Sequence, residues 1–457
     1  MTYDMNASHT KPGPGNNLLF PFIMIASLFF IWGFCHAMLE VLNRHFQNIL
    51  HVSKTQSGFV QTSVFSAYFL LALPSALLIR RIGYKGGILL GLLVVAIGAF
   101  LFIPAGLWFK TFWSFLLALF VLSSGLACIE TAANPYVTVL GPRDGAAGRL
   151  SVAQAFNSIA YILAPTVGGI LLFSKDASNG PEVDFHSLLL PYIVLGCVVL
   201  VVFAVFSFIR LPDIQEPGGI TSDANDASAH QAPLIRQPHF VWGIVTQFLY
   251  IVSQIGMFAY AVNYILENAV TIANGKEVLA QLFAWYGSIT GAKTHSATAA
   301  YVMTFANILY AAGRFTGAPI ARVIKPHFLL ACYGIFNCLL LLVIIADIKH
   351  VSWMILPLCW LFMSIMFPFI FAMSLRNLGA KTKVGASIQI MSIVGGAIAG
   401  PLMGWLADTF GMAISFALPL IGFIATAIYG FAYPRLLGQS ARAASAAMGS
   451  QSAGPRG

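Results

Sequence analysis

Residues 125–136 read GLACIETAANPY, which places the carboxylate of Glu130 inside a long apolar segment. Moving a charged side chain to the middle of a bilayer costs about 2.5 kcal/mol or more, so such residues usually face a cavity and have a function. At helical spacing Glu130 shares one face with three small or polar residues, Ser123, Ala127 and Asn134. We therefore predict that this face lines a substrate pathway, with Glu130 as its titratable centre.

The composition is that of a membrane protein that crosses the bilayer many times. Of the 457 residues, 58% are hydrophobic and 9% are charged, whereas soluble domains carry about 25% charged residues. The net charge of +9 does not require a nucleic-acid partner, because Lys and Arg accumulate on the cytoplasmic loops of membrane proteins. The six cysteines lie in apolar segments without metal-ligand spacing, which predicts packing residues and no metal site.

Apolar segments long enough to span a bilayer follow one another in two sets of six. They are predicted near 18–42, 57–79, 86–106, 112–138, 150–173 and 187–210, and then near 240–266, 297–320, 328–346, 351–375, 384–407 and 412–433. The predicted domains are a disordered N-terminus (1–16), a first half (17–210), a cytoplasmic linker (211–239), a second half (240–435) and a disordered tail (436–457).

The two halves resemble each other. Pro165 and Pro401 occupy matching segments, the fifth and the eleventh, and a Leu-Gly turn precedes each segment. Two parallel six-helix repeats around a midplane site are typical of transporters whose halves rock. With the N-terminus inside, the inner side holds most of the 24 Lys and Arg residues, Arg314 among them. This bias predicts that both termini are cytoplasmic.

Further polar residues inside the apolar segments are candidates for the same pathway. In the first segment, Glu40 is either a second titratable acid or an interfacial acid beside Arg44. The other candidates are Trp32, His36, Gln154, Asn157, Tyr161, Gln247, Tyr250, Gln254 and Asn307. Amides donate and accept hydrogen bonds, which suits a ligand rich in hydroxyls. A single amide could equally bond a neighbouring helix.

The sequence contains no HExxH, GxSxG, Walker or dinucleotide-binding motif, so no enzyme is predicted. Without a nucleotide-binding domain, uphill transport would have to draw on an ion gradient. Mid-helix carboxylates occur in the first half, and the polar positions of the second half are mostly amides and hydroxyls. This asymmetry suggests proton handling in the first half and additional substrate contacts from the second.

Four motifs carry a resemblance to a known family. ETAANPYVTVLGP from residue 130, AQAFNS at 153–158, GRFTG at 313–317 and LRNLG at 375–379 resemble the L-fucose permease family of the major facilitator superfamily. The resemblance implies twelve helices and symport of a monosaccharide with a proton. It implies substrate and proton handling by Glu130, proton coupling by Glu40, where family members usually have Asp, and substrate binding by Gln154 and Asn157.

We expect a proton-coupled monosaccharide symporter for L-fucose or a related hexose. The partners implied are the sugar, the proton and the lipid bilayer, with no cofactor. The protein is expected in the bacterial inner membrane, and as a functional monomer. A sodium-coupled hexose or N-acetylhexosamine symporter remains an alternative, and a membrane sugar sensor that does not transport remains a more remote one.

Overall fold

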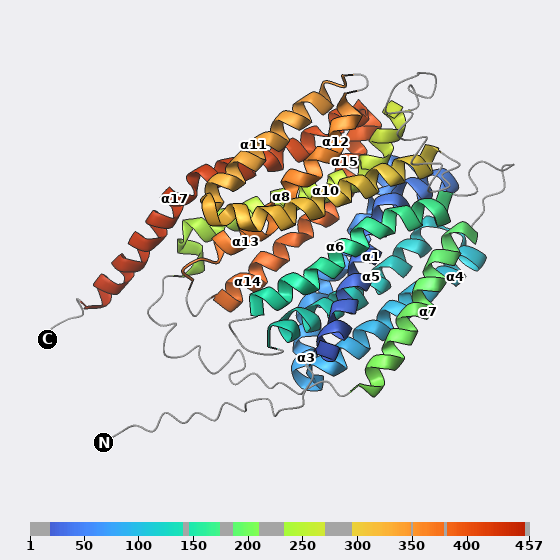
Figure 1. The fold of residues 1–457 in the computed structure, drawn as a ribbon, viewed down its shortest axis with the longest axis horizontal. Coiled ribbons are helices and arrows are strands. Elements are labelled where there is room, and N and C mark those ends of the chain that lie inside the picture. Colours follow the sequence, from blue (N-terminus) through green and yellow to red (C-terminus); the bar gives the residue numbers. More distant parts are fainter. Residues whose placement is uncertain are drawn as a thin grey trace.

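The computed structural model describes residues 19–139, 146–173, 186–209, 233–269, 295–348, 351–378 and 382–452, and every regular element among them is helical. The first half comprises α1 (Leu19–Leu50), α2 (Lys54–Ser57), α3 (Phe59–Phe100), α4 (Phe102–Pro104), η1 (Ala105–Phe109), α5 (Phe112–Val139), α6 (Ala146–Phe173) and α7 (His186–Phe208). The second comprises η3 (Leu234–Arg236), α8 (Pro238–Ala269), α10 (His295–Val323), α11 (Pro326–Ile345), α12 (Ser352–Met363), α13 (Met366–Ser374), α14 (Thr382–Met391), η6 (Ser392–Val394), α15 (Gly395–Phe410), α16 (Met412–Ser415) and α17 (Ala417–Ser452). The halves form neighbouring bundles (Figure 1).

The described helices form twelve segments long enough to cross a membrane, which confirms the predicted fold class. The long helix α3 supplies two of them, because it turns at Gly83, whose φ of 76° and ψ of 170° are not helical. A positive φ is readily adopted only by glycine. Ten of the spans also meet a hydropathy criterion. The other two, α6 and α10, are 28 and 29 residues long.

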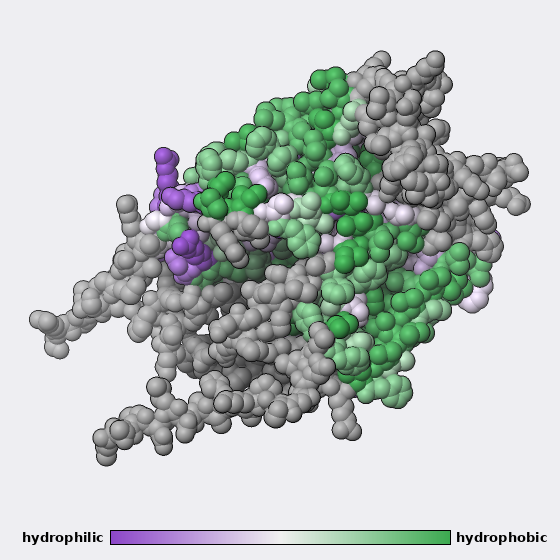
Figure 2. All heavy atoms as spheres, in the orientation of Figure 1, coloured by the Kyte–Doolittle hydropathy of each residue, from purple (hydrophilic) through white to green (hydrophobic). Residues whose placement is uncertain are grey.

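The surface of the described helices suits contact with lipid. Large apolar side chains are exposed on the outer faces of several helices, for example Val201 of α7, Leu339 of α11 and Phe431 of α17. Figure 2 shows apolar residues over much of the described surface on this side. Hydrocarbon chains cannot hydrogen-bond, so helices that satisfy their own backbone and expose apolar side chains are the stable arrangement.

One predicted boundary is wrong. The segment after Arg435 was expected to be a disordered tail, but α17 continues as a helix to Ser452. Its sequence there is rich in alanine, which has the highest helix propensity. Ser440 is also bonded to the first turn of α8, where its hydroxyl lies 2.7 Å from Nδ1 of His239. The predicted disordered N-terminus lies outside the described residues, as does most of the predicted linker.

Each half has its own buried apolar core, and some first-half side chains pack into the core of the second half. These are Phe34, Ala37 and Met38 of α1 with Tyr161 and Ala164 of α6. The hydroxyls of Thr166 on α6 and Thr304 on α10 are 2.7 Å apart. Helices α6 and α10 therefore meet each other across the two halves.

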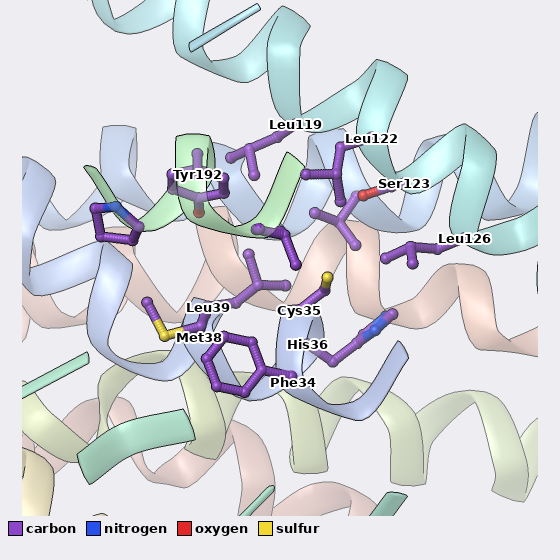
Figure 3. A pocket seen from close by; sticks show the side chains of 13 residues that line it. Phe34, Cys35, His36, Met38, Leu39, Leu119, Leu122, Ser123, Leu126 and Tyr192 are labelled. Atoms are coloured by element: carbon purple, nitrogen blue, oxygen red, sulfur yellow. The ribbon is translucent and has the colours of Figure 1, made fainter. Parts of the chain in front are cut away.

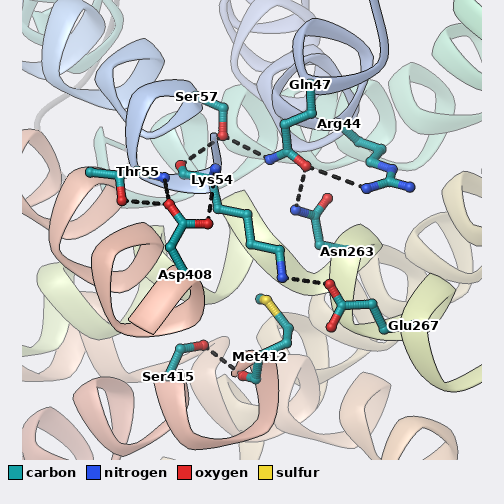
Figure 4. A network of polar contacts seen from close by, with 10 residues as sticks. All are labelled: Arg44, Gln47, Lys54, Thr55, Ser57, Asn263, Glu267, Asp408, Met412 and Ser415. Carbon is teal, nitrogen blue, oxygen red and sulfur yellow. Dashed lines mark hydrogen bonds and ion pairs between the residues drawn. The ribbon is translucent and has the colours of Figure 1, made fainter. Parts of the chain in front are cut away.

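A polar network joins the halves at the end of the bundle where α1 and α8 end (Figure 4). Asp408 of α15 accepts hydrogen bonds from the backbone nitrogens of Lys54 and Thr55, at 3.2 and 2.8 Å, and from the Thr55 hydroxyl at 2.6 Å. The carboxylate of one half thus caps the short helix α2 of the other. A negative charge is favourable there because the first amides of a helix are unpaired.

Two further contacts complete this network. The ammonium of Lys54 forms an ion pair with Glu267 of α8, at 2.6 Å. Asn263 of α8 donates to the Gln47 side chain of α1 at 2.8 Å. We call Gln47, Lys54, Thr55, Asn263, Glu267 and Asp408 the cross-half network. It holds the halves together at this end of the bundle.

Gly125 provides a test of the packing between α3 and α5. A Cβ atom on Gly125 would lie 2.5 Å from the backbone nitrogen of Val95 and 2.6 Å from the carbonyl oxygen of Gly91. Because backbone must then move, we expect Gly125→Ala to lower the free energy of unfolding by about 1–3 kcal/mol. Thermal unfolding in detergent measures the effect.

Gly438 of α17 is the matched control, because a Cβ atom there would meet nothing within 4 Å. Gly438→Ala is expected to leave the stability unchanged or to raise it by up to about 1 kcal/mol, the usual helical preference for alanine. Equal unfolding midpoints for the two variants would contradict the close approach of α3 and α5.

Candidate functional site

Glu130 lies in the middle of α5 and is half-buried. Its Oε1 atom accepts a hydrogen bond from Nδ2 of Asn134, one turn further along, at 3.4 Å. The carboxylate borders a small recess between α1 and α5, which is lined by Leu28, Phe29, Trp32, Ile129, Glu130 and Ala133. We call this the Glu130 recess. Its walls are otherwise apolar, so the carboxylate is its charged group.

Trp32, which lines the Glu130 recess, packs against two further rings. The Trp32 indole N–H donates to the Tyr68 hydroxyl of α3 at 2.6 Å. His36 lies one turn after Trp32, with ring centroids 4.4 Å apart, and it meets the Tyr68 ring edge-on at 5.4 Å. Tyr68 is within electrostatic range of Glu130. The predicted site residues Trp32 and His36 are therefore neighbours of the acid.

Ser123 and His36 also line a second recess, inside the first half (Figure 3). This recess is mostly apolar, with Phe34, Leu39, Leu122, Leu126 and Tyr192 among its walls. Ser123 is buried and does not border the Glu130 recess. The polar face predicted from spacing is thus divided between two recesses. Glu130, which accepts from Asn134, borders one, and Ser123 borders the other.

The predicted residues of α6 have different positions. Asn157 is buried, and its Nδ2 atom is 3.5 Å from the Phe29 carbonyl of α1, which it approaches over Gly33. It ties α6 to α1. Tyr161 is half-buried and packs against the core of the second half. The side chains of Glu40 and Gln154 lie outside those that the structure describes, so their predicted roles stay predictions.

In the second half, one predicted amide belongs to a charged cluster. Gln254 of α8 donates to the Tyr310 hydroxyl of α10 at 2.9 Å, and Arg314 donates to the same hydroxyl at 3.0 Å. The Arg314 guanidinium also lies over the Tyr310 ring, 4.7 Å from its centroid. Tyr161 of the first half is within electrostatic range of both Tyr68 and Arg314. Tyr161 is therefore near Tyr68 of the first half and near Arg314 of the second.

The remaining predicted residues are buried within the second half. Tyr250 is fully buried, and its hydroxyl donates to the Met363 carbonyl at 2.9 Å. Gln247 is fully buried, and neither of its amide atoms has a hydrogen-bond partner among the described residues. Asn307 is also buried. None of the three lines the Glu130 recess.

Three residues of these clusters, Tyr68, Tyr310 and Arg314, were not predicted from the sequence. Arg314 was counted with the charges of the inner loops, but it lies within α10 and bonds Tyr310 and the Ser364 carbonyl. An ionisable residue inside a predicted span was the available signal. Tyr68 and Tyr310 gave none, because a lone tyrosine in an apolar segment is more often interfacial. Among the described residues no group of three or more His, Cys, Asp or Glu could hold a metal ion.

Residues 22–398 match the family model described as Major Facilitator Superfamily. The chain belongs to the Major Facilitator Superfamily. It is 36% identical over 429 residues to the glucose/galactose transporter of Brucella abortus biovar 1 (strain 9-941), covering 93% of this chain and 97% of that one. It is 32% identical over 425 residues to the L-fucose-proton symporter of Escherichia coli (strain K12), covering 90% and 92%.

Solved structures agree with this assignment. The crystal structure of the superfamily transporter FucP in the outward conformation is 30% identical, with a TM-score of 0.63, over 91% of this chain and 99% of that one. An inward-facing bacterial homologue of the human lysosomal transporter Spinster is 13% identical, with a TM-score of 0.69, over 95% and 99%, and shows the fold alone. The resemblance to the L-fucose permease family is thereby confirmed, and the family is one of transporters, not enzymes.

Tyr68 provides a test of the geometry around the Glu130 recess. Removing its hydroxyl takes away the hydrogen bond that the Trp32 indole N–H makes at 2.6 Å, while the Glu130 carboxylate stays within reach of the same N–H. We expect Tyr68→Phe to lower the free energy of unfolding by about 0.5–1.5 kcal/mol, the usual net contribution of one hydrogen bond. Thermal unfolding in detergent is again the measurement.

Tyr333 of α11 is the matched control, because it is also half-buried but its hydroxyl forms no hydrogen bond with any described residue. Tyr333→Phe is expected to change the stability by less than about 0.5 kcal/mol. A Tyr68→Phe protein as stable as the Tyr333→Phe protein would mean that the Trp32–Tyr68 bond does not shape the recess.

Proposed function

We propose that this protein is a proton-coupled monosaccharide symporter that takes up L-fucose or a related hexose by alternating access. The observation that carries the proposal is Glu130, a carboxylate facing an interior recess with no ion-pair partner among the described residues. A carboxylate that leaves water without a paired cation is costly, and proton binding removes the charge. An acid in this position can therefore take up a proton together with the substrate.

The candidate residues of both halves support a sugar as the substrate. The rings of Trp32, Tyr68 and Tyr161 could pack on the apolar face of a hexose. Asn134 and Gln254 supply amides, which both donate to and accept from hydroxyls. The relatives named as a glucose/galactose transporter and an L-fucose-proton symporter support the same substrate class. Glu40 and Gln154 remain proposed members of the site, from the resemblance of their motifs.

The cross-half network supports the alternating-access part of the proposal. With the termini in the cytoplasm, as the Lys and Arg distribution predicts, this network lies at the outer face of the membrane. Its contacts join α2 of one half to α8 and α15 of the other. They must separate before a sugar can enter from outside. The candidate site draws on both halves of one chain, so we propose that the monomer functions in the bacterial inner membrane.

The main test is uptake into proteoliposomes with an imposed inward proton gradient. The panel comprises L-fucose, D-glucose, D-galactose and N-acetylglucosamine. We expect gradient-driven accumulation of at least one of them. Glu130→Gln keeps the size and polarity of the side chain but cannot carry the proton, so it should lower accumulation by about tenfold or more, the loss of about 1.4 kcal/mol of coupling.

Asp347→Asn is the matched control, because Asp347 is an exposed acid at the end of α11, away from the Glu130 recess. It should accumulate sugar like the wild type. Uphill accumulation by Glu130→Gln at the wild-type rate would contradict the proposed role of Glu130. Uptake that needs sodium and ignores a protonophore would replace proton coupling by the sodium alternative. Saturable binding without accumulation would favour the sensor.

Asp408 provides a test of the cross-half network. Its carboxylate accepts three hydrogen bonds from the other half. Asp408→Ala removes them, which should shift the equilibrium toward the form open to the outside by about 1–2 kcal/mol, a factor of about five to thirty. Because more protein is then ready to bind external sugar, the half-saturating concentration for uptake should fall about fivefold or more.

Asp347→Ala is the control for this variant. Asp347 lies at the same end of the bundle, but it contacts Tyr264 of its own half, at 3.4 Å, and does not bridge the halves. Its half-saturating concentration should match the wild type. If Asp408→Ala and Asp347→Ala give the same value, the cross-half network does not hold the outer face closed.

A further inference from the structure

The tenth span is broken, and the break has a local cause. Helix α12 ends at Met363 and α13 begins at Met366. Pro368 follows Ser364 by four residues and has no backbone N–H, so the Ser364 carbonyl has no donor one turn ahead. In a membrane segment such a carbonyl needs a partner from a neighbouring helix.

Two side chains from other helices supply partners at the break. Arg314 of α10 donates through Nε to the Ser364 carbonyl at 3.4 Å. Tyr250 of α8 donates its hydroxyl proton to the Met363 carbonyl at 2.9 Å. The broken span is therefore held from two sides by groups that have no role in its own hydrogen-bond ladder.

The two glycines of the motif GRFTG at 313–317 pack against this break. A Cβ atom on Gly313 would collide with the Ser364 hydroxyl, and one on Gly317 would collide with Ile365. The two glycines therefore let α10 approach the turn between α12 and α13 closely, as small residues do at helix contacts in membranes. This approach brings the guanidinium of Arg314 within reach of the freed carbonyl.

The same guanidinium also contacts the candidate residues of the second half. Its Nη2 atom donates to the Tyr310 hydroxyl at 3.0 Å, and the candidate sugar-site residue Gln254 donates to the same oxygen at 2.9 Å. Because both neighbours donate to this oxygen, the Tyr310 hydroxyl can still donate its own proton to a further acceptor, such as a sugar hydroxyl.

The partners of Arg314 are uncharged. Its hydrogen bonds go to a carbonyl and a phenol, and no carboxylate among the described residues pairs with it. The planar guanidinium presents several N–H groups in a fixed fork, so it can hold two acceptors at a set distance from each other. A lysine has one ammonium group at this place and cannot span both acceptors in the same way.

We propose that Arg314 is a positioning residue, which fixes the wall of the sugar site in the second half by holding the Ser364 carbonyl at the α12–α13 break together with the Tyr310 hydroxyl. The proposal rests on the proposed sugar transport, and it assigns to Arg314 a role through Tyr310 and Gln254, not a contact with the sugar. A change at the break should then alter sugar binding even though no residue of the break touches the sugar.

The test is a double-mutant cycle between Arg314 and Pro368, read out by equilibrium exchange of the sugar that the wild type transports. Exchange in proteoliposomes needs no proton gradient, so it reports the site apart from the coupling. Arg314→Lys keeps the positive charge but loses the planar guanidinium that bonds two acceptors. It should raise KM about tenfold, the effect of losing a hydrogen bond to a charged group, while the maximal rate changes less than about threefold.

Pro368→Ala restores a backbone N–H that can pair with the Ser364 carbonyl. Pro368 is exposed on the side of α13, so the change does not reach the site directly. In the Pro368→Ala background the Ser364 carbonyl no longer depends on Arg314 for a hydrogen bond. Arg314→Lys should therefore raise KM by less than about threefold relative to Pro368→Ala alone. A tenfold rise that persists in the Pro368→Ala background would overturn the proposal, because Arg314 would then act on the sugar without the break.

Tyr250→Phe provides a second cycle if the lysine variant is not recovered in folded form. It removes the donor to the Met363 carbonyl, and it should raise KM by about three- to tenfold in the wild type but less in the Pro368→Ala background. Arg81→Lys, at an exposed arginine of α3, is the charge control and should exchange like the wild type. Unchanged KM in both Arg314→Lys and Tyr250→Phe would also overturn the proposal.

The outcomes separate this inference from the proposed function. If the wild type exchanges none of the panel sugars, the proposed function fails, and the inference fails with it. If the wild type exchanges a sugar and the Arg314 and Pro368 effects multiply independently, the function stands and the positioning role of Arg314 fails.

Discussion

The bilayer interior contains no water to bind a polar group, and the arrangement of this protein depends on that constraint. Each polar group placed at membrane depth must be bonded by another part of the chain or must face a recess. The Ser364 carbonyl, freed by Pro368, is bonded by Arg314 of another helix. The Glu130 carboxylate instead borders a recess, with Asn134 as its neighbour. The first solution fixes structure, and the second leaves a group available for a substrate.

The same constraint explains where polar side chains of α6 and α10 lie. A helix that faces lipid on most sides has to be apolar, whereas a helix covered by protein can carry amides and hydroxyls. These two helices pack against each other across the halves, and Thr166 bonds Thr304 at their contact. The hydroxyls at this contact therefore lie at the interface between the halves, where protein covers them.

The sequence alone was sufficient for features that depend on local rules. Apolar length predicted the spans, and the rule on intramembrane acids selected Glu130, which does face a recess. Features that depend on how helices rotate against each other were not predictable. Tyr68 of α3 contacts Trp32 of α1, although the two residues are 36 positions apart in the sequence. Arg314 lies near the end of its predicted span, where a cation is normally a topology signal, and only the packing of α10 on the broken span turns it inward.

Each half holds one group of opposite charge within a long helix. The first half supplies Glu130, and the second supplies Arg314. A direct ion pair between acid and base would hold the halves together permanently, because separating it in a dry interior is costly. Among the described residues no such ion pair is formed: Glu130 accepts from Asn134, and Arg314 donates to a carbonyl and a phenol. The halves can then part without breaking a buried ion pair, while the acid stays free to exchange its proton.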